Sequence, residues 1–397
     1  MQQLVVLGAT GSIGLNTLDV VERHPERYLV HALAANQSVD KMLELVATHN
    51  PRVVVMGDAD AAEQVAAALP PEATTEVRWG DAEMVAIVED PVVDVVMAAI
   101  VGFAGLRPTL AAAEAGKRLL LANKEALVSA GSVFMQGVRK GGAVLLPIDS
   151  EHNAMFQCVP SDHQARPQMA SVEKIVLTAS GGPFRGKTRD ELLDVKPEQA
   201  CAHPNWSMGP KISVDSATLV NKGLELAEAC WLFSSTPEKI EVVIHPQSIV
   251  HSMIRYTDGS VLAQLGNPDM RTPIAYGLAW PERISAGVQP LDLVAAGRLD
   301  FWAPDLDAFP CLRLAQEAIA LPGGMCVLNA ANEIAVASFL ARDIRFIDID
   351  RVIEAALAGV QLTEPSTLEE VEALDAKARE CAAEAVANMT SKPSKED

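Results

Sequence analysis

The chain has 397 residues, of which 49% are hydrophobic and 21% are charged, and its formal net charge is -20 at pH 7. A chain of this length exceeds one ordinary hydrophobic core, so we expect two or three domains. The negative charge argues against a nucleic-acid or anionic-membrane partner, because most of the surface would repel phosphates. A phosphorylated small molecule remains compatible where local Lys, Arg and helix N-termini overcome that repulsion.

The cysteine pattern and the N-terminal residues indicate the cellular compartment. No C-x-x-C pair occurs, so we expect free thiols in a reducing cytoplasm rather than disulfides or a zinc site. The first predicted strand begins almost at Met1, which leaves no room for a signal peptide. No apolar run reaches membrane-spanning length. These features predict a soluble, cytoplasmic protein.

Residues 4–148 alternate short β-branched runs with helical patterns, which is typical of a parallel sheet covered by helices on both faces. The predicted strands are 4–8, 30–34, 52–56, 76–79, 93–100, 118–122 and 143–148. The predicted helices include 13–23, 81–88, 106–115 and 125–139.

A glycine-rich turn follows the first predicted strand and opens the first predicted helix, with Gly8, Gly11 and Gly14 spaced as G-x-x-G-x-x-G. Such a turn directs backbone N–H groups and a helix N-terminus at a pyrophosphate, while Gly14 allows close helix-to-strand packing. The spacing departs from the G-x-G-x-x-G fingerprint. The dinucleotide-binding interpretation therefore depends on the position of the turn, between the first strand and first helix of the alternating region.

The second predicted strand ends without an acidic residue at 33–38, where an NAD enzyme commonly presents one to the ribose. This absence favours NADP over NAD. Asn123, Lys124 and Glu125 follow the predicted strand 118–122, at the edge where ligands bind in open α/β sheets. These polar residues either contact the ligand or merely form the start of a helix.

Two carboxylates follow the predicted strand 143–148. Asp149 and Glu151 lie two residues apart, so on an extended segment they would face the same way. Their repulsion is relieved by a hard dication with oxygen ligands. Glu225 is the best third ligand, on a predicted helix 222–233 with Asn221 as its N-cap. The alternative is a solvated loop followed by an ordinary capped helix.

After Ser150 the predicted strands no longer alternate regularly with helices. The predicted strands 174–178, 240–244, 249–256 and 261–265 are separated by longer loops, which suggests a mixed or antiparallel sheet in a second, α+β domain. Residues 181–210 resemble a mobile lid. A linker at 281–310 leads to a small helical domain with predicted helices 311–320, 325–341, 349–362 and 367–389. The tail 391–397 is polar, and we expect it to be disordered.

Further polar residues suit an anion and a closing lid. Residues 178–182 end a strand with hydroxyl groups and two glycines, and Ser216, Asn221 and Lys222 could add donors. Each of them could equally serve a turn or a cap. Trp206 and His203 lie in the lid, where the tryptophan could cover a bound ligand. The alternative is that Trp206 is packed and His203 is a surface residue.

The chain resembles the 1-deoxy-D-xylulose 5-phosphate reductoisomerase family, whose members use NADPH in the methylerythritol phosphate route to isoprenoids. The resemblance covers nearly the whole chain and depends on eight segments. They are LGATGSIG (7–14), LANKEALV (121–128), PIDSEH (147–152), ASGGPF (179–184), HPNWSMG (203–209), KISVDSAT (211–218), NKGLE (221–225) and HPQS (245–248).

The resemblance implies roles for several of the matched residues. Asp149, Glu151 and Glu225 would bind Mg²⁺ or Mn²⁺, with Co²⁺ also possible. Ser180, His203, Ser216, Asn221 and Lys222 would hold the substrate phosphate, Ser150 would contact the substrate backbone, and Trp206 and Met208 would lie in the lid. Glu151, Lys124 and His152 would be catalytic, with Glu151, Lys124 and Glu225 also contacting substrate.

The resemblance also implies the cofactor contacts and a homodimer. The pyrophosphate would lie on Thr10, Gly11, Ser12 and Ile13, the adenosine ribose near Ala35, Asn36 and Gln37, and the nicotinamide half near Asn123 and Glu125, with Gly209 as a further cofactor contact. The sequence departs from the family at Gln37, where a basic residue is common.

The implied reaction is a rearrangement of 1-deoxy-D-xylulose 5-phosphate to a branched aldehyde, followed by its reduction to 2-C-methyl-D-erythritol 4-phosphate. A second hypothesis is a metal-assisted NADP dehydrogenase of another phosphorylated hydroxy compound, which would yield no branched product. A third is a non-catalytic NADP-sensing protein. The three carboxylates and the lid argue against the third hypothesis, because a sensor needs neither.

Overall fold

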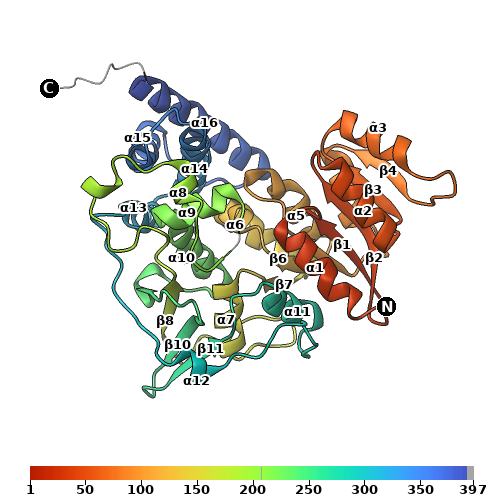
Figure 1. The fold of residues 1–397 in the computed structure, drawn as a ribbon, viewed down its shortest axis with the longest axis horizontal. Coiled ribbons are helices and arrows are strands. Elements are labelled where there is room, and N and C mark those ends of the chain that lie inside the picture. The colour runs from red at the N-terminus through yellow and green to blue at the C-terminus, as the bar shows by residue number, and fades with distance from the viewer. Residues whose placement is uncertain (207, 391–397) are drawn as a thin grey trace.

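The computed structural model describes residues 1–206 and 208–390, so the predicted disorder of the tail 391–397 lies outside the described residues. Its architecture is mixed α/β, with two sheets and a group of C-terminal helices (Figure 1). The N-terminal sheet lies on the right of Figure 1, the second sheet at the lower left, and the C-terminal helices at the upper left.

The first sheet has seven parallel strands in the order β4-β3-β2-β1-β5-β6-β7, which confirms the predicted parallel sheet. Several strands are buried along their length, because helices between the strands cover the sheet. The strands are β1 (Gln2–Leu7), β2 (Tyr28–Ala35), β3 (Val53–Met56), β4 (Glu76–Trp79), β5 (Val95–Ala98), β6 (Arg118–Leu121) and β7 (Val144–Pro147). The helices are α1 (Ser12–Glu22), α2 (Val39–His49), α3 (Ala59–Ala68), α4 (Asp81–Glu89), α5 (Leu106–Glu114) and α6 (Lys124–Gly141).

The strand order reverses between β1 and β5, and this reversal places the ligand site. From β1 the chain runs outward through β2, β3 and β4, then returns to β5 on the other side of β1. The loops after β1 and β5 therefore diverge and leave a crevice at the carboxyl edge. The segments that follow β6 and β7 extend the same edge.

The glycine-rich turn after β1 has the tight geometry that its sequence predicts. Gly8 has a φ of 82°, and a Cβ on it would lie 2.5 Å from the main-chain oxygen of Ala99. A Cβ on Gly14 would lie 2.6 Å from the main chain of Ala9. Only glycine lets this turn pass between the ends of β1 and β5 and lets α1 start against it.

The second sheet has four strands in the order β11-β10-β8-β9 and is mixed, as predicted. Strand β8 is parallel to β9 and antiparallel to β10, which is antiparallel to β11. The strands are β8 (Val172–Ala179), β9 (Ile240–Ile244), β10 (Val250–Tyr256) and β11 (Val261–Leu265). Helix α7 (Ser150–Cys158) joins the two sheets and packs against β10 and β11.

The segment 281–310, expected to be a linker, is attached to the second sheet. It contains the short helix α12 (Leu293–Ala296), and Trp302 exchanges main-chain hydrogen bonds of 2.8 and 2.9 Å with Ile244 of β9. The preceding helix α11 (Arg271–Ala279) returns to the first sheet and packs on α1, where Arg271 lies 3.0 Å from Asp19.

The C-terminal helices pack on one another and on the helices that lead from the active site. They are α13 (Cys311–Ile319), α14 (Gly324–Leu340), α15 (Ile349–Gly359) and α16 (Leu368–Thr390). The helix predicted at 349–362 ends earlier, at Gly359. Among the described residues, no helix combines the length and the apolar character needed to cross a bilayer.

Candidate active site

A cavity of about 180 Å³ opens at the carboxyl edge of the first sheet. It lies between loops of this sheet and segments from the second half of the chain. Its walls include the loops after β1, β5, β6 and β7, the turn after β8, the segment 203–209, and the helices α9 (Pro210–Thr218) and α10 (Val220–Leu232). The lining contains most of the residues that the sequence singled out.

Three carboxylates meet in this cavity. The oxygen atoms that Asp149, Glu151 and Glu225 offer lie within 4.8 Å of one another. The predicted extended segment is wrong: Asp149 is the N-cap of α7, and Glu151 lies in the first helical turn, where its N–H donates to Asp149 at 3.2 Å. The helix start turns both side chains to one side, so the predicted cluster forms by a different route.

Helix α10 supplies Glu225 and begins differently from the prediction. Its N-cap is Leu219, with a left-handed φ of 63°, and not Asn221. Asn221 lies inside the first turn, where its side chain donates to Glu225 and accepts from the Lys124 ammonium at 2.9 Å. Asn221 therefore orients charged groups and does not cap the helix.

Two lysines offset the charge of the carboxylates. Lys124 pairs with Asp149 and lies 3.1 Å from Glu225, while Lys222 lies 3.0 Å from Glu151 and pairs with Glu225. Burial alone would lower the pKa of Lys124, but the charges of Asp149 and Glu225 outweigh it and hold the pKa well above its usual value. Burial and the neighbouring charge of Glu225 raise the pKa of Glu151 to about 7.

A buried second layer lies behind the carboxylates. His152 has no exposed surface, and its Nε2 donates to the main-chain carbonyl of Glu225 at 2.8 Å. Its Nδ1 lies 3.4 Å from Asp149 and 3.3 Å from Glu228. His152 does not line the cavity, so this geometry fits a positioning role and offers no contact with a substrate. Glu228 was not predicted from the sequence, although its i+3 spacing from Glu225 on α10 places both on one face.

The predicted phosphate residues divide into two groups. The hydroxyl of Ser180 lies 2.8 Å from His203 Nε2. The N–H groups of Asn205 and Trp206 donate to His203 Nδ1. Because Nδ1 accepts, Nε2 carries the proton and donates to Ser180. Burial lowers the pKa of His203 to about 4, which keeps the ring neutral at pH 7. Ser216 lies beside this pair, because its main chain packs on the turn that follows Ser180.

Lys222 and Asn221 form the other group and face the carboxylates. The ammonium of Lys222 contacts Glu151 and Glu225, so the sequence-based picture of Lys222 as a separate phosphate cation is incomplete. Lys222 lies three residues before Glu225 on α10, so helical spacing places both on one face, whereas its contact with Glu151 of α7 comes from the packing of the fold.

The segment 181–210 closes one side of the cavity. Trp206 and Met208 line it, whereas Ser207 lies outside the described residues. The side chain of Asn205 donates to Ser248 at 3.0 Å and to the Pro246 carbonyl, and the ring of Trp206 lies 6.1 Å from that of His251. These contacts attach the predicted lid to the loop between β9 and β10.

The predicted cofactor residues lie on adjoining parts of the sheet edge. Ser12 and Ile13 line the cavity beside Thr10 and Gly11 of the same turn. Ala35 is buried at the end of β2, next to β1, and is followed by the exposed Asn36 and Gln37.

Asn123 and Glu125 serve the start of α6 in different ways. Asn123 is the N-cap of α6, accepting from Ala126 at 2.8 Å, and it donates to the carbonyls of Ile100 and Gly102, so its amide is committed to the scaffold. Glu125 and Gly209 line the cavity. Glu125 accepts from Lys211 at 2.6 Å, a partner that the sequence analysis missed.

The chain matches three family models. The model of 1-deoxy-D-xylulose 5-phosphate reductoisomerase matches residues 4–131, and two C-terminal domain models of the same enzyme match residues 145–233 and 265–381. The 1-deoxy-D-xylulose 5-phosphate reductoisomerase of Pseudomonas putida W619 is 59% identical, and the match covers 97% of this chain and 98% of that protein. That of Ectopseudomonas mendocina is 60% identical over 97% of this chain and 98% of the relative.

Solved structures agree with these relatives. A DOX-P reductoisomerase in complex with NADPH, fosmidomycin and magnesium has a TM-score of 0.93 at 46% identity, covering 99% of this chain and all of that chain. The Zymomonas mobilis enzyme in complex with NADPH has a TM-score of 0.89 at 46% identity, covering 97% and 98% of the two chains. From the fold, the carboxylate site and these matches, we conclude that the chain belongs to the 1-deoxy-D-xylulose 5-phosphate reductoisomerase family.

Proposed function

We infer that this protein converts 1-deoxy-D-xylulose 5-phosphate to 2-C-methyl-D-erythritol 4-phosphate, using NADPH and a divalent metal ion. The observation that carries this inference is one cavity containing the Asp149, Glu151 and Glu225 cluster beside the glycine-rich turn after β1. The alternative dehydrogenase is not favoured, because relatives named for the reductoisomerase match 97% of the chain.

The carboxylate cluster fits a hard dication. Three carboxylates offer oxygen ligands within 4.8 Å of one another, and Lys124 and Lys222 leave one carboxylate charge without a matching ammonium. We assign Asp149, Glu151 and Glu225 as ligands for Mg²⁺ or Mn²⁺. When bound, such an ion polarises hydroxyl and carbonyl oxygens, and NADPH supplies the hydride.

The protein's own residues bind and orient the substrate. Ser180, His203 and Ser216 form a wall of hydroxyl and N–H donors for the phosphate, and Asn221 and Lys222 line the same cavity in contact with the carboxylates. Ser150 and Lys124 lie beside the carboxylates, where they suit the oxygens of the sugar backbone. His152 holds Asp149 and the main chain of Glu225 in place from behind.

The cofactor half of the cavity adjoins this substrate half. The turn Thr10–Ile13 would take the pyrophosphate, Ala35, Asn36 and Gln37 the adenosine ribose, and Glu125 and Gly209 the nicotinamide side, with Asn123 fixing the scaffold. Trp206 and Met208 would close over the ligands and exclude water from the reacting carbons.

We propose domain boundaries that follow this division of labour. Residues 1–149 form the NADPH-binding domain, 150–280 the metal and substrate domain with the lid 181–210, 281–310 the connection, and 311–390 the helical domain. A cytoplasmic location fits the described cysteines, all six of which are free thiols.

We also propose a homodimer, in which β11 faces the second copy. Strand β11 is an edge of the second sheet, and its residues are exposed along most of its length, including Val261 at 51% and Leu262 at 49%. An exposed apolar edge strand is a template for pairing with another chain. Helix α12 also carries exposed Leu293 and Val294.

Replacing the carboxylate of Glu225 should remove metal-dependent turnover. In Glu225→Gln, loss of one ligand should lower kcat/KM roughly a thousandfold or more, while NADPH binding, measured by fluorescence titration, stays within about twofold. The exposed Glu63→Gln on α3 is the matched control and should keep its activity. Near-normal turnover in Glu225→Gln would contradict the metal assignment.

Ser216 tests the phosphate wall without disturbing the carboxylates. Ser216 lines the cavity, so Ser216→Ala should raise KM about tenfold through one lost charge-assisted bond to the phosphate. The preference for the phosphorylated over the dephosphorylated sugar should fall by the same factor. Ser213→Ala on the same helix, whose hydroxyl bonds to the Gly209 carbonyl, is the control. Unchanged discrimination in Ser216→Ala would place the phosphate elsewhere.

Trp206 should report closure of the lid. Indole fluorescence should change when the substrate or a phosphonate analogue is added, and most of the change should vanish in Trp206→Phe because this ring lines the cavity. Trp79→Phe, 61% exposed on β4, should keep the change. A signal that survives Trp206→Phe would assign it to another of the five tryptophans.

The charge substitution Leu262→Lys should separate the proposed dimer. Light scattering after gel filtration should give twice the chain mass for the unaltered protein and a mass near one chain for the variant, because a buried lysine at the interface would lack a partner. Val92→Lys, 53% exposed before β5, should stay dimeric. A monomeric unaltered protein would refute the dimer itself.

A further inference from the structure

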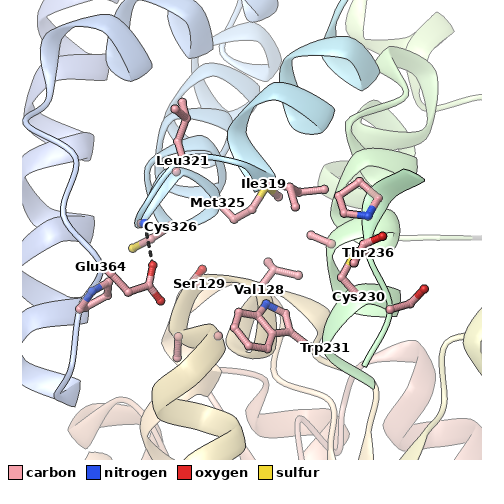
Figure 2. A pocket seen from close by; sticks show the side chains of 18 residues that line it. Val128, Ser129, Cys230, Trp231, Thr236, Ile319, Leu321, Met325, Cys326 and Glu364 are labelled. Carbon is pink, nitrogen blue, oxygen red and sulfur yellow. Dashed lines mark hydrogen bonds between the residues drawn. The ribbon is translucent and has the colours of Figure 1, made fainter. Parts of the chain in front are cut away.

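A second cavity, of about 230 Å³, lies among α6, α10, α13 and α14 and shares no lining residue with the active site (Figure 2). Figure 2 shows Trp231 and Val128 on one side of the hollow, with Ile319 and Met325 across from them. These four side chains give the cavity an apolar body. Such a volume suits one aromatic ring with a short chain, since an engineered cavity of about 150 Å³ accepts benzene.

Polar atoms in this cavity lack partners. Ser129 is 4% exposed and lines the cavity, and none of the described residues hydrogen-bonds to its hydroxyl oxygen. The same holds for the hydroxyl of Ser235 at another part of the wall. Buried hydroxyl groups are normally paired, and leaving them unpaired costs free energy. A ligand with one hydrogen-bonding head group would supply the missing partner.

The charge around the cavity has one sign. Among the described residues that line the cavity, only Glu364 is charged; it is exposed, and its carboxylate accepts hydrogen bonds from the hydroxyl of Ser132 at 3.1 Å and from the N–H of Gly323 at 3.0 Å. In a chain of net charge -20, an anion finds no countercharge here. A cation would gain both the carboxylate and the face of the Trp231 indole ring.

The cavity wall depends on a break in α6. Gly131 has non-helical angles, φ 40° and ψ -104°, in the middle of this helix, and a Cβ on it would lie 2.6 Å from the ring of Trp231. The left-handed φ and the close ring both require glycine at this position. The break therefore seats the indole against the α6 main chain, where the ring forms part of the wall.

We propose that this cavity is a second ligand site, which binds a small aromatic ammonium cation. The aromatic body packs between Trp231 and Met325, and the ammonium group lies toward Glu364. The hydroxyl of Ser129 accepts a hydrogen bond from the same head group.

The test uses 2-phenylethylammonium as the probe, titrated into the full-length protein by calorimetry and by tryptophan fluorescence. For a ligand this small we expect a Kd on the order of a millimolar. Two compounds of matched size separate charge from shape: 2-phenylethanol should bind about tenfold more weakly, and phenylacetate should not bind detectably. The fluorescence change should be lost in Trp231→Phe.

Variants locate the probe. Glu364→Gln should weaken binding about tenfold, and Ser129→Ala should weaken it severalfold, because each removes one partner of the ammonium group. Glu369→Gln, which changes the same charge on an exposed residue outside the cavity, should bind normally. Circular dichroism and the melting temperature confirm that each variant is folded.

Three results would overturn the proposal. The first is phenylacetate binding as tightly as the ammonium probe. The second is binding that is indifferent to both Glu364→Gln and Ser129→Ala in folded variants. The third is binding that disappears in Glu225→Gln but not in Glu364→Gln, which would place the cation in the active-site carboxylate cluster. None of these readouts requires turnover, so the outcome does not depend on the proposed reaction.

Discussion

Repulsion among Asp149, Glu151 and Glu225 is the constraint on which the active site depends. Three carboxylates with oxygens within 4.8 Å of one another are stable in a buried place only beside positive charge. Lys124 and Lys222 supply part of it, and burial together with the charge of Glu225 still raises the pKa of Glu151 to about 7. The cluster thus has the oxygen ligands and the residual negative charge that suit a dication.

The fold holds this cluster together from several directions. Asp149 and Glu151 start α7 after the last strand of the parallel sheet, and Glu225 comes from α10, which packs on α6 and α13. His152 and Glu228 fill the space behind the carboxylates, where water would otherwise compete. Removing any of these supports would change the spacing of charges, so the site depends on packing as much as on its ligands.

Much of this arrangement could be predicted from local sequence. The glycine-rich turn and the alternating strands and helices indicated a parallel sheet with a phosphate-binding edge, because backbone geometry and helix dipoles act within a few residues. The resemblance named the ligand residues. The partner of Glu125 was missed because it depends on which distant helix lies opposite, whereas the starts of α7 and α10 are local features that the predicted strand and N-cap misassigned.

The sequence by itself determined the two sheets and the family, since each is encoded by periodicity or by contiguous residues, and the resemblance named the three carboxylates. Only the tertiary structure decided that the Lys124 ammonium pairs with Asp149 and Glu225, that His152 lies behind the carboxylates, and that Trp231 lies against Gly131 in the wall of a second cavity. The physical reason is that charge pairing and close packing join residues of different helices, and the packing of those helices appears in no single segment of the chain.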